Sequence, residues 1–263
     1  MQVVLRPTAD EASSLVARMI AKALRDKPDL VLGLATGTTM ERLYGILARM
    51  HQKEGLDFSL VRTFNLDEYI GIPADDPHSY HYYMHQHFFR HINIDRRNIF
   101  LPDGMAKDLK AEAKSYEEKM ARCGGIDVQL LGLGTVGHIG FNEPLSSFYS
   151  RTRDKSLTPT TIAQNSRMFE DSSRMPRRAL TMGIGTILDS KALILLATGT
   201  TKAEILAKAI EGPVTSMISA TAIQLHHDCR VIVDEEAASL LQARDYYRWI
   251  YENEPEWEEY RHR

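Results

Sequence analysis

The chain has 263 residues, of which 43% are hydrophobic and 25% charged, and its formal net charge at pH 7 is -3. This length and composition predict one large domain, 1–263, with a substantial core. The small negative charge and the scattered basic residues argue against a nucleic-acid partner, and the only two cysteines, Cys123 and Cys229, lack metal-ligand spacing, which favours a reducing compartment over a disulfide framework.

The first predicted element is an amphipathic helix over residues 9–26. Thr8 and Glu11 have the spacing of a capping box, and apolar side chains follow at helical intervals, namely Leu15, Val16, Met19, Ile20, Ala23 and Leu24. No apolar signal core precedes this helix, and no run of the chain has the length needed to span a membrane. We therefore expect a cytoplasmic protein without a membrane partner.

A buried strand near 30–35 then leads through a short turn into a helix near 40–51. The turn consists of Thr36, Gly37, Thr38 and Thr39. Backbone N–H groups at the start of the helix, together with the positive end of its dipole, can hold a phosphate without a metal. A nucleotide P-loop would have a lysine next, whereas Met40 and Glu41 stand there, which argues against ATP. On its own, the turn is also consistent with an ordinary helix N-cap.

The next predicted strand, near 61–66, ends in two adjacent acids, Asp67 and Glu68. Ligands of an open parallel sheet bind at the carboxyl ends of its strands, so we expect Asp67 to share one crevice with Thr36 and with His138, which follows a later strand. Burial at an apolar strand end would raise the pKa of the Asp67 carboxyl and make it a better base. Taken alone, such an acid pair is often a helix N-cap.

That later strand, near 126–133, runs into a glycine-rich loop, Gly132 to Pro144, which contains His138 and Glu143. Its glycines allow tight turning and close approach of the backbone to a ligand; they are Gly132, Gly134, Gly137 and Gly140. The first three also match the G-x-G-x-x-G of dinucleotide-binding turns. That motif should open a long amphipathic helix, and the early proline and the absence of a helical period argue against one. We interpret the loop as part of an active site.

In the rest of the chain, predicted helices near 108–122, 202–211 and 235–250 alternate with strands near 192–198 and 230–233. The alternation predicts an α/β fold, a Rossmann-like parallel sheet sandwiched by helices, in a single domain without an internal repeat. The stretch 153–181 is the least regular. The sequence does not decide whether the acidic and aromatic tail, 246–263, packs on a neighbour or stays frayed.

Four histidines raise the question of a metal site, because His81/His85 and His87/His91 have i,i+4 spacing on a predicted helix. The glutamate of an H-E-x-x-H motif is replaced by Tyr82, and no third ligand is evident. We therefore expect no metal here, and we interpret these histidines as helix-surface or core residues.

Eight segments carry a resemblance to a known family. They are LGLATGTT, FNLDEYIGI, DPHSYHYYM, GHIGFNEP, SSFYSRTR, NSRMF, ALTMGIGTIL and TGTTKAE. In this order, over nearly the whole chain, they resemble the isomerising glucosamine-6-phosphate deaminases. The resemblance implies a Rossmann-like α/β sandwich that turns glucosamine 6-phosphate and water into fructose 6-phosphate and ammonia, with no cofactor.

The resemblance also implies roles for residues at the matching positions. Asp67 corresponds to the general base that moves a proton from C2 to C1, His138 to the acid/base that opens the sugar ring, and Glu143 to the carboxylate that orients this histidine. Gly137 belongs to the substrate site, and Arg167 and Lys202 complete the phosphate site. Without the resemblance, both cations would be interpreted as solvated surface residues.

One position departs from the family pattern. Many members carry aspartate or asparagine where this chain has Val136, and that polar group would help to hold the catalytic histidine. Because valine cannot accept a hydrogen bond, the orientation of His138 must depend more heavily on Glu143. Slower ring opening or a changed substrate preference would follow.

The resemblance further implies regulation. Ser146, Arg153 and Lys155 match the site at which hexameric members bind N-acetylglucosamine 6-phosphate between subunits, although a solvated basic turn is the alternative. We therefore expect a homo-oligomer, a hexamer, with sigmoidal kinetics relieved by this effector. The family uses the region corresponding to 153–181 as a mobile lid.

Three alternative functions remain open from the sequence. A deaminase for galactosamine 6-phosphate would differ only in the epimer at C4, which cannot be inferred here. A 6-phosphogluconolactonase would not need the base in FNLDEY. A non-catalytic sugar-phosphate sensor should carry a helix-turn-helix segment, for which we find no room before Thr8 or after Tyr247.

Overall fold

The computed structural model describes residues 1–261 and is built on one seven-stranded sheet. Its strands follow the order β1 (Gln2–Arg6), β10 (Cys229–Asp234), β9 (Ala192–Ala197), β6 (Val128–Leu131), β2 (Val31–Leu34), β3 (Arg62–Asn65) and β5 (Ile99–Phe100). All neighbouring strands pair in parallel. The predicted parallel α/β fold is confirmed, but its two edge strands, β1 and β5, were not predicted from the sequence.

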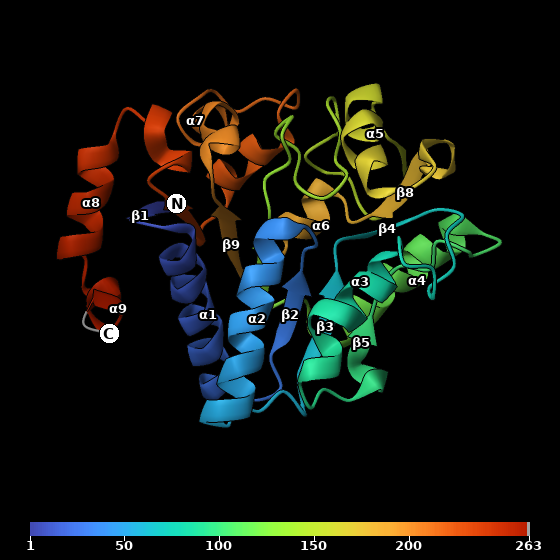
Figure 1. The fold of residues 1–263 in the computed structure, drawn as a ribbon, viewed down its shortest axis with the longest axis horizontal. Helices are drawn as coiled ribbons and strands as arrows, with labels where there is room; N and C mark the ends of the chain where they lie inside the picture. The colour runs from blue at the N-terminus through green and yellow to red at the C-terminus, as the bar shows by residue number, and fades with distance from the viewer. Residues whose placement is uncertain (262–263) are drawn as a thin grey trace.

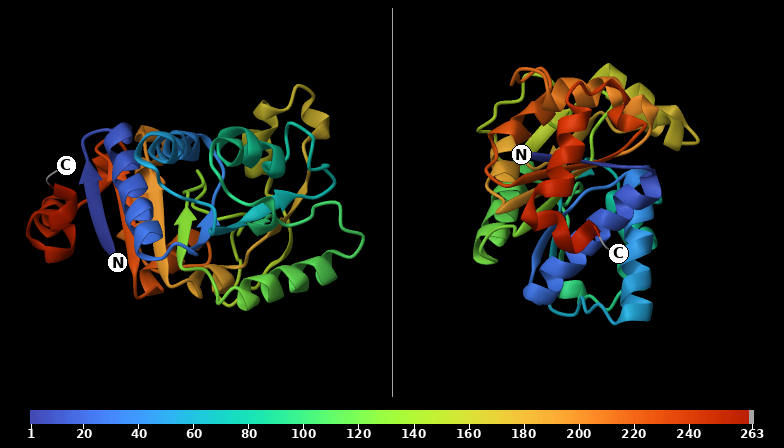
Figure 2. Two further views of the ribbon diagram at one scale, coloured as in Figure 1. Left: turned by 90° about the horizontal axis from the view of Figure 1, so that it is seen from below. Right: turned by 90° about the vertical axis from the view of Figure 1, so that its left-hand side faces the viewer.

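Helices cover both faces of this sheet. Figure 2 shows α1 (Ala9–Asp26), α2 (Thr38–Glu54) and α3 (Tyr80–His87) on one face and α4 (Leu109–Arg122) on the other. The N-cap Thr8 accepts the N–H of Glu11 at 3.2 Å, while the Glu11 carboxylate binds Arg6 at 3.0 Å instead of closing the capping box. α1 therefore begins where predicted, with half of the predicted cap.

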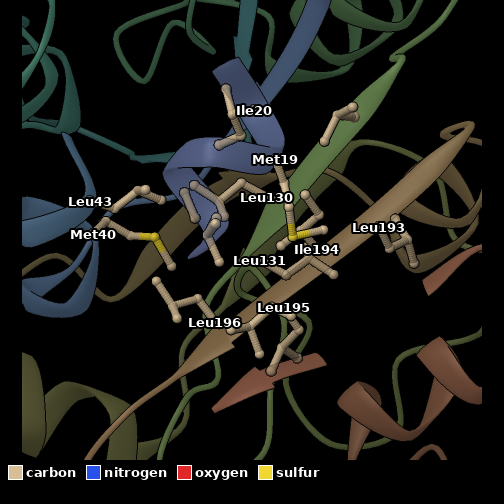
Figure 3. Packing of buried hydrophobic residues seen from close by; sticks show 14 of the residues in the cluster. Met19, Ile20, Met40, Leu43, Leu130, Leu131, Leu193, Ile194, Leu195 and Leu196 are labelled. Atoms are coloured by element: carbon tan, nitrogen blue, oxygen red, sulfur yellow. The ribbon is translucent and has the colours of Figure 1, made fainter. Parts of the chain in front are cut away.

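The core lies between these helices and the central strands. Figure 3 shows buried side chains of α1, α2, β6 and β9, among them Met19, Ile20, Met40, Leu43, Leu130, Leu131, Leu193, Ile194, Leu195 and Leu196. The near-continuous apolar runs of β6 and β9 are typical of parallel strands that are buried on both faces. Such burial contributes roughly 1.5–3 kcal/mol for each large apolar side chain, so this core holds the strand ends in fixed positions.

A second, three-stranded sheet lies beyond the carboxyl ends of the main strands. It contains β4 (Asp67–Tyr69), β8 (Arg178–Thr181) and β7 (Arg153–Ser156), all paired antiparallel. This sheet was not predicted, and the stretch 153–181, expected to be the least regular, does contain short regular elements. β7, α5 (Pro159–Asn165) and β8 give this stretch regular structure, because the 67–69 strand leaves the main sheet and offers its edge to β8.

The C-terminal part differs from the single helix predicted near 235–250. A short 3-10 helix at Ala237–Leu240 is separated from α8 (Arg244–Asn253). The break arises because the Glu211 carboxylate accepts the N–H groups of Gln242 and Ala243, at 2.8 to 3.1 Å, and so fixes a turn there. α8 and α9 (Glu258–Arg261) then lie beside β1 at the outer edge of the sheet (Figure 1).

The tail packs on its own chain. Trp257 is buried, and its indole N–H donates to Gln2 Oε1 at 2.9 Å. The order of the tail that the sequence left open is thereby resolved for residues 246–261, and Figure 2 shows α8 and α9 on the same side of the sheet as β1. Across residues 1–261, none of the helices combines the length and the apolar character needed to cross a bilayer.

Candidate active site

Three of the predicted site segments follow adjacent strands. β6, β2 and β3 are neighbours in the sheet and parallel, so their carboxyl ends lie at one edge. The loop of His138 follows β6, the turn of Thr36 follows β2, and Asp67 follows β3. The expected meeting of these segments at one edge is confirmed, and β9 adds its own carboxyl end next to β6.

The turn after β2 starts α2 without a side-chain cap. Its N-cap, Gly37, has φ 118°, a value that side-chain-bearing residues rarely adopt. The Tyr83 hydroxyl donates to the Gly37 carbonyl at 2.8 Å, and the Thr36 hydroxyl is hydrogen-bonded to Tyr80. The first N–H groups of α2, at Thr38 and Thr39, have no partners within the helix and remain available to an anion.

A second turn of the same sequence follows β9, although the sequence analysis expected no repeat. Leu-Ala-Thr-Gly-Thr-Thr occurs at 34–39 and again at 196–201. Gly199 also has positive φ, 87°, and leads into a 3-10 helix, Thr200–Lys202, and then α7 (Ala203–Ile210). Its N–H donates to both carboxylate oxygens of Asp234 at 3.0 Å. The repeated hexapeptide is the sequence signal that would have revealed this second turn.

Lys202 stands at the end of this second turn. Burial lowers the pKa of its ammonium group, and among residues 1–261 no carboxylate lies within 4 Å of its Nζ. A half-buried cation without an acidic partner is costly unless a ligand supplies the negative charge. Its position is therefore suited to a phosphate group.

Asp67 occupies the first position of β4, opposite Thr181 of β8. Its side chain is only 7% exposed. Burial, followed by the nearby charge of Glu68, raises the pKa of the Asp67 carboxyl to about 8, while a hydrogen bond from the Phe141 N–H acts in the opposite direction. A carboxylate with a raised pKa is a stronger base than an exposed one.

His138 and Glu143 face each other within the loop. The imidazole Nδ1 lies 3.5 Å from Glu143 Oε2, and the carboxylate also accepts the N–H of Thr158 at 3.1 Å. Burial favours a higher pKa for the Glu143 carboxyl, but hydrogen bonds with His138 and Thr161 and the charge of His138 outweigh it and lower the pKa. The carboxylate is thus kept ionised beside the imidazole, where it can orient the ring.

Two glycines of the loop are required by close approach. A Cβ on Gly134 would lie 2.1 Å from Cδ2 of His138, so any side chain there would displace the imidazole. Gly140, with φ 55°, has Thr181 Oγ1 and Asp67 Oδ2 within 3.4 Å of the position that a Cβ would occupy. Gly137 has φ 81° and its carbonyl accepts the N–H of Ala220 at 2.9 Å. Tight turning is thus confirmed at Gly137 and Gly140 and close packing at Gly134, while close approach of this backbone to a ligand stays a prediction.

Glu68 has a structural place beside the base. Its carboxylate accepts the N–H groups of Tyr80 and His81, at 3.0 and 2.9 Å, and also contacts His81 Nδ1 at 2.9 Å. It therefore fixes the start of α3. His81 is engaged by this carboxylate, His91 contacts the carbonyl of Gln86, and within residues 1–261 no three His, Cys, Asp or Glu side chains are grouped as metal ligands.

Tyr69 was not singled out from the sequence, yet it connects several parts of the site. Its hydroxyl accepts hydrogen bonds from Asn165 of α5 at 2.8 Å and from Tyr80 of α3 at 3.3 Å. Its ring contacts Phe141 of the loop, with centroids 5.5 Å apart. The only sequence signal was its position two residues after Asp67.

The other predicted residues are placed less directly. Arg167 lies on a 3-10 helix, Ser166–Met168, and is exposed, and within the described part of the chain no hydrogen bond or ion pair connects it to the loops of Asp67 and His138. Val136 is half-buried in the loop. Arg153 donates to Ser146 Oγ at 3.2 Å and lines a cavity of about 400 Å³ between α4 and β7, whereas Lys155 is not among the lining residues of that cavity.

Comparison with known proteins agrees with this geometry. A profile described as glucosamine-6-phosphate isomerases/6-phosphogluconolactonase matches residues 6–232. A glucosamine-6-phosphate deaminase from Thermoanaerobacter sp. (strain X514) is 46% identical over 245 residues, which are 93% of this chain and 97% of the relative. Glucosamine-6-phosphate deaminase 1 from Bacillus subtilis (strain 168) is 48% identical over 240 residues, 91% of this chain and 99% of the relative.

Solved structures agree as well. A monomeric glucosamine-6-phosphate deaminase is 48% identical and superposes with a TM-score of 0.89, covering 91% of this chain and 100% of that one. A 6-phosphogluconolactonase from Trypanosoma cruzi, 22% identical with a TM-score of 0.72 over 92% of this chain and 97% of that one, shares the fold. The chain belongs to the glucosamine-6-phosphate isomerase/6-phosphogluconolactonase family and, within it, to the glucosamine-6-phosphate deaminases.

Proposed function

We propose that this chain converts glucosamine 6-phosphate and water into fructose 6-phosphate and ammonia. The observation that carries the proposal is Asp67, a buried carboxyl whose pKa is raised to about 8, next to a loop in which His138 faces Glu143. The relatives named above are deaminases of this substrate. Each proton transfer at carbon and at the ring oxygen can be assigned to a side chain of this chain.

Ring opening is assigned to His138. The proton on the anomeric hydroxyl must leave and a proton must reach the ring oxygen, which one imidazole can accomplish. Glu143 holds Nδ1, so Nε2 is the nitrogen left for the sugar. Since Val136 supplies no polar group here, this orientation depends on Glu143.

Isomerisation and deamination are assigned to Asp67. The carboxylate removes the C2 proton, and its electron pair forms the C1–C2 double bond while the C1 carbonyl pair moves to oxygen, which takes a proton from the substrate ammonium to give an enolamine. The proton held by Asp67 then returns to C1. Water then adds to the resulting C2 iminium and ammonia leaves. General base catalysis of this kind contributes about 10²- to 10⁴-fold.

The phosphate group is assigned to the N-terminus of α2 and to Lys202. The helix offers the N–H groups of Thr38 and Thr39, and Lys202 offers a charge that no carboxylate of residues 1–261 neutralises. Arg167 would join them by a movement of the segment 153–181, which we propose closes over the substrate as a lid. The hydrogen bond from Asn165 to Tyr69 gives this segment a direct contact with β4.

The function is tested by measuring ammonia release from glucosamine 6-phosphate, from its C4 epimer galactosamine 6-phosphate, and hydrolysis of 6-phosphogluconolactone. We expect release from the first substrate and loss of at least 100-fold in Asp67→Asn, with Asp75→Asn, on the exposed part of the following loop, as the control. In deuterated solvent, label should enter C1 of the product. Activity on the lactone alone, or release unaffected by Asp67→Asn, would contradict the proposal.

We further propose that Arg153 and Ser146 belong to an effector site for N-acetylglucosamine 6-phosphate in an oligomer. In support, Arg153 lines the cavity between α4 and β7, and Ser146 Oγ donates at 2.7 Å to the carbonyl of Glu143, which connects that cavity to the active-site loop. A similar solved deaminase is described as monomeric, so the hexamer stays a prediction. Sedimentation with and without the effector, together with substrate-saturation curves, tests both; a monomer with hyperbolic kinetics unaffected by the effector would contradict them.

A further inference from the structure

Thr181 at the end of β8 has a position that the proposed mechanism does not use. It is fully buried and lies directly opposite Asp67 in the antiparallel pair of β4 and β8. Directly opposed residues of such a pair have Cβ atoms about 4.5–5.5 Å apart on the same face of the sheet. Thr181 and the proposed base are therefore neighbours whose side chains share one small volume.

The two side chains share one hydrogen-bond donor. The N–H of Phe141 donates to Thr181 Oγ1 at 3.1 Å, and the same N–H is also hydrogen-bonded to the Asp67 carboxylate. The hydroxyl hydrogen of Thr181 is directed to the carbonyl of Met182 at 3.3 Å, so its oxygen faces the amide as an acceptor. One N–H group thus serves two acceptors, of which only the carboxylate changes charge.

Gly140 allows the loop backbone to lie close to both Thr181 and Asp67. The position of a Cβ on Gly140 would be 3.0 Å from Thr181 Oγ1 and 3.4 Å from Asp67 Oδ2, so both acceptors contact the same face of the loop backbone. The Asn142 side chain fixes the loop by donating to the carbonyls of Ile139 and Met182, both at 2.9 Å. The loop cannot withdraw its amide from either acceptor without breaking these contacts.

Few charges compete with this amide. Titratable or charged groups near Asp67 and Thr181 include Glu68 and Tyr69 on β4, Tyr80 on α3, Tyr116 on α4, Arg153 on β7, and His138 and Glu143 on the loop. Burial raises the pKa of each of the three phenols, so they are neutral at pH 7. The guanidinium of Arg153 donates to Ser146. The Phe141 N–H is therefore a main source of stabilisation for the Asp67 anion.

We propose that Thr181 is a positioning residue for the base, whose hydroxyl oxygen holds the Phe141 N–H when Asp67 is protonated and shares it when Asp67 is ionised. This inference rests on the proposed function for its catalytic meaning. Without the second acceptor, the amide would bind the carboxylate alone, stabilise the anion, and make Asp67 a weaker base. With it, the amide is satisfied in both protonation states, so neither state leaves a buried donor unpaired.

The test compares three threonine variants. Thr181→Val removes the acceptor at nearly unchanged volume, Thr181→Ser keeps it, and Thr63→Val replaces a buried threonine whose hydroxyl has no partner in the described chain. Since Asp67 must be ionised to act, kcat falls as pH drops below its pKa. In Thr181→Val we expect this acid limb to move down by about 0.5 to 1 pH unit and the high-pH plateau to fall several-fold. The other two variants should retain the limb of the unchanged protein.

A second measurement does not depend on activity. The carboxyl carbon of Asp67, labelled with ¹³C and assigned by its absence in Asp67→Asn, should titrate at lower pH in Thr181→Val than in the unchanged protein. If the unchanged protein releases no ammonia and this titration still moves, the proposed function fails while the role of Thr181 stands. An unmoved or upward titration, or an equal shift in Thr63→Val, would overturn the role of Thr181 itself.

Discussion

The two Leu-Ala-Thr-Gly-Thr-Thr turns have the same sequence and the same left-handed glycine, but their surroundings differ. At 34–39 the chain enters the long helix α2 at once, and no side chain caps its N-terminus. At 196–201 it passes through a 3-10 turn before the short helix α7, and Asp234 of β10 accepts the Gly199 N–H with both oxygens. Identical residues therefore build one turn that is open to an anion and one that already has its own.

The difference shows that neighbouring strands, rather than the turn sequence, decide what such a turn can bind. Asp234 supplies the negative charge for the second turn internally and also accepts the N–H of Ala237 at 2.8 Å. The backbone N–H of Gly199 is therefore already bound to an anion. The group of this turn that remains for a ligand is the ammonium of Lys202. The first turn offers backbone N–H dipoles at the start of α2, and the second offers the positive charge of Lys202. Together these groups suit a phosphate.

The largest expected effect is on the cation of the second turn. Lys202→Gln should reduce kcat/KM about 100-fold, mainly through KM, because a hydrogen bond between charged groups is lost. Burial lowers the pKa of Lys202, so KM should also rise as pH increases through that lowered pKa in the unchanged protein. Lys208→Gln, on the exposed face of α7, is the control. An equal loss of kcat/KM in that variant would mean that Lys202 has no special role in binding the phosphate.

An intermediate effect is expected from the internal anion of the second turn. Asp234→Asn weakens the acceptors for Gly199 and Ala237, which should lower the free energy of unfolding by about 1–3 kcal/mol. KM should rise with it, since Lys202 is then held less firmly. Denaturant unfolding and substrate saturation measure both. Unchanged stability would mean that the two turns are equivalent after all.

The smallest effects are expected from alanine at the two turn glycines, where stability should fall equally and only KM should differ between the turns. Gly37→Ala and Gly199→Ala each force a side chain into positive φ and should each cost about 1–2 kcal/mol of stability. Both positions face open space, so no clash adds to this cost. We expect KM to rise more in Gly37→Ala, where the backbone itself binds the phosphate. An equal rise in KM in both variants would contradict the division of roles.

The main sheet and its site edge could be predicted because buried parallel strands leave continuous apolar runs. These runs predict five strands, and the bounds agree with the structure to within a few residues. The five are β2, β3, β6, β9 and β10. Asp67, Thr36 and His138 could be placed together because parallel strands end at one edge.

The second sheet could not be predicted in the same way. β4 has three residues and β7 is Arg153–Ser156, a polar segment that resembles a surface loop. Both become strands only because β8 lies between them, and such long-range pairing leaves no local pattern. For the same reason Thr181 and Tyr69 could not be recognised as neighbours of the site from their sequence positions.

The place of β1 at the sheet edge affects how the chain is made. Among residues 1–261, the strand that pairs with it is β10, which begins at Cys229. During synthesis, β1 therefore cannot pair until the chain has been made at least as far as β10, and Trp257, which bonds to Gln2, arrives later still. This edge of the sheet thus depends on contacts between segments that are far apart in the sequence, and it forms after the central strands have been made.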